Sequence, residues 1–100
     1  MKKRFLKSKP VCKVTFELPS QAANGAAKVT LVGDFNGWDH TTTPLKRLKD
    51  GAYRLILDLP RDREYQFRYL IDGERWENDW EADKYLSNST GDSENSVVVT

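Results

Sequence analysis

Three tryptophans in a chain of 100 residues are the side chains best suited to chemistry at a surface. Trp38 follows Asn36 and Gly37, and both residue types tolerate the positive φ of a tight turn. Trp76 follows a second turn signal, an Asp-Gly pair. A ring on a tight turn can be held outward at low entropic cost. Trp38 therefore has two interpretations, an exposed binding ring or a cap over the end of a core.

Flat rings beside charged or amide groups suit sugars in particular. Sugar rings present C–H faces that stack on an aromatic ring, and their hydroxyls need hydrogen-bonding partners next to it. Arg68 is predicted to face away from the core on the strand before the second turn, and Asn95 begins the last strand. The sequence therefore predicts a carbohydrate-binding surface that contains Trp38, Arg68, Trp76 and Asn95, provided that the fold brings them together.

No group of residues fits a catalytic or metal site. His40 is the only histidine and lies in a predicted loop, with no cysteine or serine motif near it. A cluster of carboxylates lacks the central glycine of a calcium loop, and a catalytic pair needs a cleft that raises one pKa. We expect these carboxylates to be solvated and to protect strand edges; they are Asp72, Glu74, Glu77, Asp79, Glu81 and Asp83. The sequence thus predicts no catalytic residue, no metal and no cofactor.

Composition and charge limit the classes of partner that the protein can have. The net charge of +1 gives no global field to attract nucleic acid or a membrane. No apolar run is long enough for a spanning helix or a signal peptide, and a single cysteine, Cys12, excludes an internal disulfide. We therefore expect a cytoplasmic protein with no nucleic acid and no membrane among its partners. The glycosylation sequon at Asn88 is interpreted as chance.

Alternating apolar residues and frequent turn signals predict an all-β domain. Residues 1–10 are expected to form a basic N-terminal tail, residues 20–27 a loop, and residues 78–94 a long polar loop. The expected strands are 11–18, 29–35, 45–49, 53–59, 64–72, a short return at 75–77, and 95–100. About seven short antiparallel strands without helical periodicity indicate a β-sandwich.

One face of each long strand is expected to build the core. Residues 29–35 alternate with one buried face. Cys12 is expected to behave as a small buried hydrophobe and not as a nucleophile. The predicted core-facing sets are Cys12, Val14, Phe16 and Leu18; Tyr53, Leu55, Leu57 and Leu59; and Tyr65, Phe67, Tyr69 and Ile71.

Three sequence blocks carry a family resemblance. They are residues 32–39 (VGDFNGWD), 65–76 (YQFRYLIDGERW) and 94–99 (ENSVVV). In this order and spacing they resemble the family 48 carbohydrate-binding modules, which are glycogen- and starch-binding domains also called isoamylase N-terminal or early-set domains. The resemblance covers roughly residues 11–100, which we take as the domain. It implies an immunoglobulin-like antiparallel β-sandwich of the early-set type.

The resemblance also implies a ligand and a site. Members that bind sugar hold α-1,4-glucan between two Trp rings, with a basic residue and an Asn as hydrogen-bonding partners. The matching residues here are Trp38 and Trp76, Arg68 where the modules of AMP-activated protein kinase carry Lys, and Asn95.

One loop of this chain departs from the pattern of the family. The kinase modules have a Leu-Gly-Thr loop that enters the curve of the glucan, whereas residues 89–93 of this chain contain no leucine. Ser93 is matched to the hydroxyl of that loop. Trp80 is an additional ring, which either replaces the missing leucine or packs under the loop.

The sequence and the resemblance together predict a non-catalytic binder of α-1,4-glucan, with glycogen, maltooligosaccharides and cyclodextrin as ligands. Many members attached to enzymes act as packing domains beside the catalytic barrel. The alternative is therefore an accessory or protein–protein module for a separate glycogen-metabolising enzyme of glycoside hydrolase family 13. Hydrolase activity is the third possibility.

Overall fold

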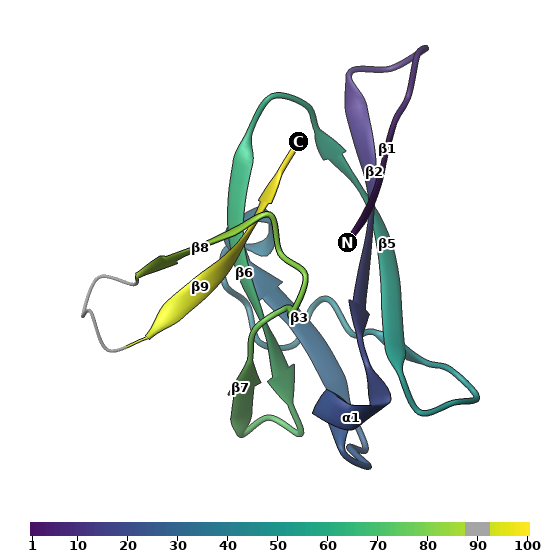
Figure 1. Cartoon of the computed structure of the whole chain (residues 1–100), viewed down its shortest axis with the longest axis vertical. Helices are drawn as coiled ribbons and strands as arrows, with labels where there is room; N and C mark the ends of the chain where they lie inside the picture. Colours follow the sequence, from purple (N-terminus) through teal and green to yellow (C-terminus); the bar gives the residue numbers. More distant parts are fainter. Residues whose placement is uncertain (88–92) are drawn as a thin grey trace.

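The computed structural model describes residues 1–87 and 93–100, which form two antiparallel sheets packed face to face (Figure 1). The first sheet has the strand order β1-β2-β5-β4, with bounds Lys2–Phe5, Val11–Leu18, Tyr53–Pro60 and Lys46–Arg47. The second sheet has the order β3-β6-β9-β8, with bounds Val29–Gly33, Glu64–Ile71, Glu94–Val99 and Lys84–Ser87. A short strand, β7 (Arg75–Glu77), pairs with β6. The predicted β-sandwich is confirmed, with nine strands among the described residues instead of about seven.

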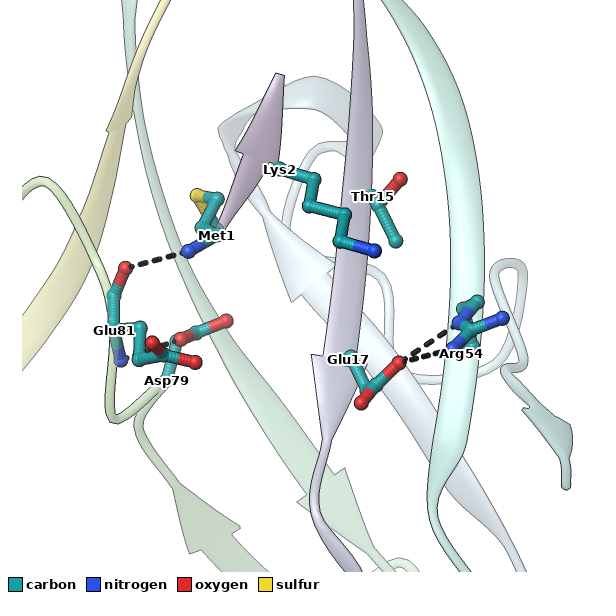
Figure 2. A pocket seen from close by; sticks show the side chains of 7 residues that line it. All are labelled: Met1, Lys2, Thr15, Glu17, Arg54, Asp79 and Glu81. Atoms are coloured by element: carbon teal, nitrogen blue, oxygen red, sulfur yellow. Dashed lines mark hydrogen bonds and ion pairs between the residues drawn. The ribbon is translucent and has the colours of Figure 1, made fainter.

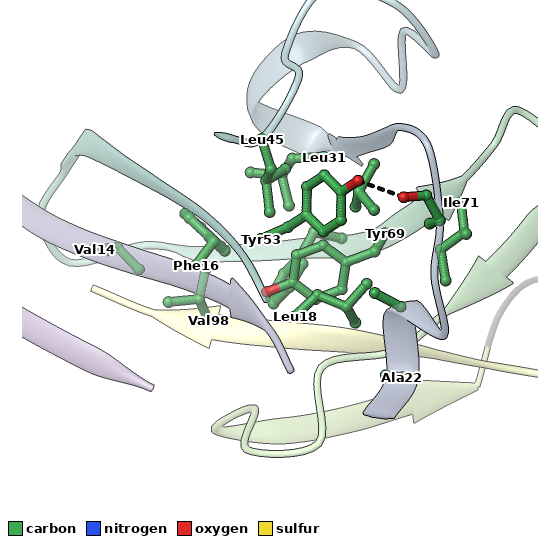
Figure 3. Packing of buried hydrophobic residues seen from close by; sticks show 14 of the residues in the cluster. Val14, Phe16, Leu18, Ala22, Leu31, Leu45, Tyr53, Tyr69, Ile71 and Val98 are labelled. Carbon is green, nitrogen blue, oxygen red and sulfur yellow. Dashed lines mark hydrogen bonds between the residues drawn. The ribbon is translucent and has the colours of Figure 1, made fainter. Parts of the chain in front are cut away.

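The core lies between the sheets and follows the predicted alternation. All four inward residues of β2, including Cys12 and Phe16, are fully buried. The Phe16 ring meets the edge of Phe67 across the interface, with centroids 5.0 Å apart. Figure 3 shows this packing, with side chains from both sheets interdigitated around Tyr53 and Tyr69. Burying one such aliphatic or aromatic side chain contributes roughly 1.5–3 kcal/mol, so the inward-facing residues stabilise the packing of the two sheets.

The prediction of an N-terminal tail is wrong for residues 2–5, which form strand β1 and pair with β2. Lys2 lies opposite Thr15, and Phe5 lies opposite Cys12. Lys3 also donates to the Asp83 carboxylate at 2.7 Å, which ties β1 to the second sheet. Charged residues suit an edge strand because they discourage further pairing. Such a strand has little apolar alternation, so its sequence resembles that of a solvated tail.

Two expected loops contain regular structure. Residues 20–27 include one helical turn, α1 (Ser20–Ala23), which ends at Asn24 in the left-handed conformation. Residues 78–94 include β8, whose four residues are all exposed and pair with β9. A strand without a buried face carries no period-2 signal, so the prediction of a continuous loop failed there.

Strand β3 is shorter and more buried than expected. It ends at Gly33, after which Asp34–Asn36 form a 3-10 helix. All five of its residues are buried, so the expected single buried face is wrong. Residues 43–45 cover its free edge: Leu31 N donates to Thr43 O at 2.8 Å, and Leu45 N donates to Val29 O at 2.9 Å. Because these bonds use the edge of β3, the expected strand 45–49 is reduced to β4.

Candidate functional site

The outer face of the second sheet carries the predicted polar and aromatic residues. Val32 pairs with Arg68 between β3 and β6, and Leu70 pairs with Trp76 between β6 and β7. Side chains of directly opposed residues lie on the same face, and residues two apart along a strand share that face. Tyr69 faces the core. Arg68 and Trp76 therefore lie together on the outer face.

Arg68 and Trp76 line one shallow hollow of about 160 Å³, together with Glu77, Asn78 and Ser93. The Trp76 side chain is 38% exposed there. The guanidinium of Arg68 is held by the Glu94 carbonyl, at 3.0 Å from Nε and 2.6 Å from Nη2, and by a hydrogen bond from Nη2 to the Ser93 hydroxyl. The cation is thus fixed in place beside an available aromatic ring.

Asn95 is linked to this hollow through a neighbouring glutamine. Its Nδ2 donates to Gln66 Oε1 at 3.0 Å. Gln66 lies two residues before Arg68 on β6 and so points to the same face. Asn78 Nδ2 donates to the Glu94 carbonyl that Arg68 also uses. Asn78 thus lies beside the guanidinium, while Gln66 and Asn95 lie outside the lining of the hollow but on the same face. Amides and a cation together supply the donors and acceptors that hydroxyl ligands require.

Trp38 lies in a strained turn directly after the 3-10 helix. Gly37 has φ 66 and Trp38 has φ 58, whereas Asn36 stays helical, so the positive φ falls one residue later than the sequence indicated. Positive φ is rare for a bulky side chain and costs on the order of 1–3 kcal/mol. The turn is held by two hydrogen bonds of 2.9 Å, from Trp38 N to Gly33 O and from Trp38 Nε1 to Asp34 Oδ1.

The neighbours of Trp38 connect it to the rest of the face. The second carboxylate oxygen of Asp34 accepts from Gln66 N at 2.7 Å, and Gln66 in turn contacts Asn95. Trp38 itself is half-buried. It therefore neither caps the core fully nor stands fully in solvent.

The loop after Trp38 reaches the other tryptophan. The His40 ring meets Trp76 edge-on, with centroids 5.2 Å apart. Asp39 shapes this loop by accepting from the backbone N–H of Thr41 at 2.8 Å and from its hydroxyl at 2.9 Å. These two bonds hold the pKa of Asp39 below its usual value. His40, expected to be merely exposed, thus joins the loop after Trp38 to Trp76 on β7.

Trp80 lies away from the hollow that contains Arg68. Its side chain is 54% exposed and lines a second hollow, of about 230 Å³, with Glu17 at the end of β2 and Gln21 in α1. Its Nε1 donates to Glu77 Oε1 at 3.0 Å. The loop that Trp80 was expected to complement includes residues 88–92, which lie outside the described residues. The two interpretations of Trp80 as a partner of that loop therefore remain predictions.

One member of the acidic cluster is buried, contrary to expectation. Asp79 is only 5% exposed and accepts from the Tyr69 hydroxyl at 2.7 Å. Burial, and next the charge of Asp79, raise the pKa of Tyr69 well above its usual value. Within residues 1–87 and 93–100, no three His, Cys, Asp or Glu side chains are grouped to hold a metal ion. The same residues contain no helix of the length and apolar character needed to cross a membrane.

Several residues of this face were missed by sequence reasoning. Asp34 had a usable signal, because it stands four residues before Trp38, a spacing that brings side chains together in a helical turn. His40 had none, since its contact with Trp76 depends on how two distant turns are placed. Gln66 and Asn78 are ordinary polar residues whose role comes only from the strand register.

Comparisons with known proteins match most of this chain to one family. The family model for carbohydrate-binding module 48 (isoamylase N-terminal domain) matches residues 12–86. The 1,4-α-glucan branching enzyme GlgB of Photobacterium profundum is 39% identical over 46 residues, which cover 45% of this chain and 6% of that enzyme. The enzyme of the same name from Novosphingobium aromaticivorans is 38% identical over 50 residues, covering 48% of this chain and 7% of that enzyme. The chain therefore corresponds to a small part of each relative.

Proposed function

Because this chain belongs to the family of carbohydrate-binding module 48, the isoamylase N-terminal domain, we propose that it binds α-1,4-glucan on the outer face of its second sheet. The site is the hollow that contains Arg68, Trp76 and Ser93, extended by Asn95 and Trp38. The proposed ligands are glycogen, maltooligosaccharides and cyclodextrin.

The observation that carries the proposal is the pairing of an accessible indole with a fixed cation. Trp76 is 38% exposed in the same hollow as Arg68, whose guanidinium is held by Glu94 O and Ser93 Oγ. A pyranose ring stacks on the indole, while its hydroxyls accept from the guanidinium and exchange hydrogen bonds with nearby amides. Since these side chains are already ordered, little conformational entropy is lost on binding.

The affinity is expected to be modest. The hollow measures about 160 Å³, whereas sites that enclose a small molecule measure roughly 300–1,000 Å³. Such a shallow site buries only one side of a sugar ring. We therefore expect a Kd between micromolar and millimolar, or about −8 to −4 kcal/mol.

Glycogen co-sedimentation with tryptophan variants tests the proposal. Trp76→Ala and Trp38→Ala should each reduce the fraction of protein bound to glycogen by about tenfold or more, because each removes a stacking ring. Phe5→Ala is the matched control, since Phe5 is a 47% exposed aromatic residue on β1 of the opposite sheet. Unchanged sedimentation of both tryptophan variants contradicts the site.

We propose that the chain acts without catalysis, as expected from the absence of an acid–base pair in its sequence. Incubation with maltoheptaose followed by a reducing-sugar assay tests this directly. Release of reducing ends by the purified chain, above that of a heat-denatured sample, contradicts the proposal. We further propose that the protein works in the cytoplasm. Fractionation of the native cells tests this, because the protein should be recovered in the cytoplasmic fraction.

A second candidate function is an accessory module for a separate glycogen-metabolising enzyme of glycoside hydrolase family 13. The outer face of the first sheet supports it, because Ile56 is 50% exposed there, opposite Thr15 on β2. Co-elution with a 1,4-α-glucan branching enzyme in gel filtration, abolished by Ile56→Lys, would favour this function. Glycogen binding that depends on Trp76 and persists without any partner favours the first.

A further inference from the structure

The hollow around Trp80 has the features of a sugar-binding surface and is not used by the proposed site. Trp80 is the most exposed tryptophan, at 54%. The hollow it lines, of about 230 Å³, is larger than the one at Trp76. Glu17, Pro19 and Gln21 form its opposite wall. An exposed indole is thus placed beside an amide and carboxylates.

This hollow is separate from the one at Trp76. The two linings have no residue in common among the described part of the chain. Trp76 lies on the outer face of the second sheet, whereas the hollow at Trp80 spans the end of the sandwich and reaches residues at the end of β2. Trp76 and Trp80 each line their own hollow. Any ligand at Trp80 therefore occupies a second site.

The Trp80 ring is held in one orientation. Its only polar atom, Nε1, donates to Glu77 Oε1 at 3.0 Å. With this edge occupied, the flat face of the indole is what remains for a ligand. Holding the ring in place before binding lowers the entropy that binding would cost.

Two of the three carboxylates around the hollow, those of Glu17 and Asp79, accept hydrogen bonds within the chain. Glu17 accepts from Arg54 Nη2 at 2.8 Å. Asp79 accepts from the Tyr69 hydroxyl and from Glu81 N. Figure 2 shows Glu17 with its arginine, and Asp79 with Glu81, around an adjoining pocket that has these three acidic residues in its lining. Such groups supply lone pairs to hydroxyls without requiring a cationic ligand.

We propose that Trp80 forms a second α-glucan subsite, in which a neutral pyranose unit stacks on the indole and its hydroxyls donate to Glu17, Gln21 or Glu81. This inference rests on the proposed function, because it assumes the same class of ligand. A branched or long glucan that reaches both hollows would be held at two points. Its effective local concentration then raises the overall affinity without any new contact.

The three indole N–H groups give a direct test by ¹⁵N-edited NMR. Titration of the chain with maltotriose should shift the Trp80 indole signal with its own saturation curve, distinct from that of Trp76. In Trp76→Ala the Trp80 signal should still shift over the same concentration range. Trp80→Ala should in addition lower retention on glycogen about tenfold, with Phe5→Ala as the control.

The other outcomes separate this inference from the proposed function. A Trp76 signal that shifts while that of Trp80 stays fixed overturns the second subsite and leaves the proposed function intact. A shift of the Trp80 signal that disappears in Trp76→Ala also overturns the second subsite. The sugar would then bind at Trp76 and change the Trp80 signal through Glu77. If neither signal shifts and glycogen retention is absent, both proposals fail.

Discussion

The ring of His40 packs edge-on against the indole of Trp76, with 5.2 Å between the centroids. This contact joins two turns that are far apart in the sequence. One turn follows β3 and carries Trp38, while the other follows β6 and leads into β7, which carries Trp76. The relative placement of the two rings therefore depends on a residue with no expected role.

Replacing His40 by alanine should weaken glucan binding without unfolding the domain. An edge-to-face aromatic pair is worth about 0.5–1.5 kcal/mol, so the Kd for maltoheptaose should rise about two- to tenfold. Calorimetric titration measures this change. His40→Phe keeps a ring and should restore most of the affinity. A Kd unchanged in His40→Ala would show that the contact does not order the site.

Asp34→Ala should loosen both Trp38 and β6. The carboxylate accepts from Trp38 Nε1 and from Gln66 N, and hydrogen bonds to charged groups contribute roughly 1.5–3 kcal/mol each before solvent exposure reduces them. We expect a loss of about 1–2 kcal/mol in the free energy of unfolding and weaker glucan binding. Asp50→Ala is the control, because Asp50 accepts from Ala52 N in a turn outside the site. An equal loss of binding in both variants would contradict a specific role of Asp34.

The sequence predicted what depends on local pattern. The alternation in β2 and β6 identified core residues from Cys12 to Ile71, although Tyr65 is only partly buried against that core. The Asp-Gly and Asn-Gly pairs located the turns, because few residue types accept left-handed backbone. Arg68 was correctly predicted to face away from the core, since successive side chains of a strand point to opposite faces of the sheet.

What the sequence did not predict depends on contacts between distant segments. Strands β1 and β8 are largely exposed edge strands, which carry no period-2 pattern of their own. Asp79 looked like a solvated acid, and its burial against Tyr69 arises from the path of the chain after β7. The two hollows cannot be read from the spacing of Trp76 and Trp80. Those residues are only four apart and yet line different surfaces.

Gly33→Ala should displace Trp38. A Cβ at this position would lie 2.6 Å from Gln66 O and 2.7 Å from Phe67 Cβ, so β3 and β6 would have to separate. Overpacking of this kind costs about 1–3 kcal/mol. The Gly33 carbonyl that accepts from Trp38 N would move with it. We expect lower thermal stability and a shifted Trp38 indole signal by NMR.

Gly25→Ala is the control for that prediction. Gly25, unlike Gly33, has a positive φ, of 74, and nothing lies within 4 Å of the added Cβ. Its cost comes from the backbone alone, about 1–2 kcal/mol. The Trp38 indole signal should stay in place. A Trp38 signal that moves equally in both variants would contradict the steric argument at Gly33.

Tyr69→Phe should destabilise the domain by leaving Asp79 without its hydroxyl donor. An unsatisfied buried acceptor costs about 1–3 kcal/mol. Tyr53→Phe is the control: its hydroxyl donates to the neutral Ala26 carbonyl at 2.6 Å, and its loss should cost about 0.5–1.5 kcal/mol. Urea denaturation at pH 7 measures both. A smaller loss in Tyr69→Phe than in Tyr53→Phe would contradict this account.

The raised pKa of Tyr69 also predicts a dependence on alkaline pH. The unfolded chain loses the Tyr69 proton at its usual pKa of about 10, whereas the folded chain retains it. Stability is therefore fully present below pH 10 and declines as the pH rises through the raised pKa of the folded state. Tyr69→Phe should lack this part of the decline. If the original chain and Tyr69→Phe lose stability equally as the pH rises above 10, Tyr69 does not cause the decline.

The lowered pKa of Asp83 predicts that stability is lost at acid pH instead of alkaline pH. Burial alone raises the pKa of Asp83, but the hydrogen bonds from Lys3 Nζ and Val99 N outweigh it and hold that pKa below the usual 3.8. As the pH falls, the unfolded chain is protonated first. The stabilisation from Asp83 is therefore present above pH 3.8 and disappears as the pH falls through the lower pKa of the folded state.

Asp83→Asn tests this link between β1 and the second sheet. The variant should be less stable than the original chain at pH 6, and its stability should fall less between pH 4 and pH 2, as measured by urea denaturation. Asp58→Asn is the control, because Asp58 pairs with Lys13 at 3.1 Å on an open surface, where such pairs contribute about 0–1 kcal/mol. If Asp83→Asn is as stable as the original chain at pH 6, β1 is not held by this carboxylate.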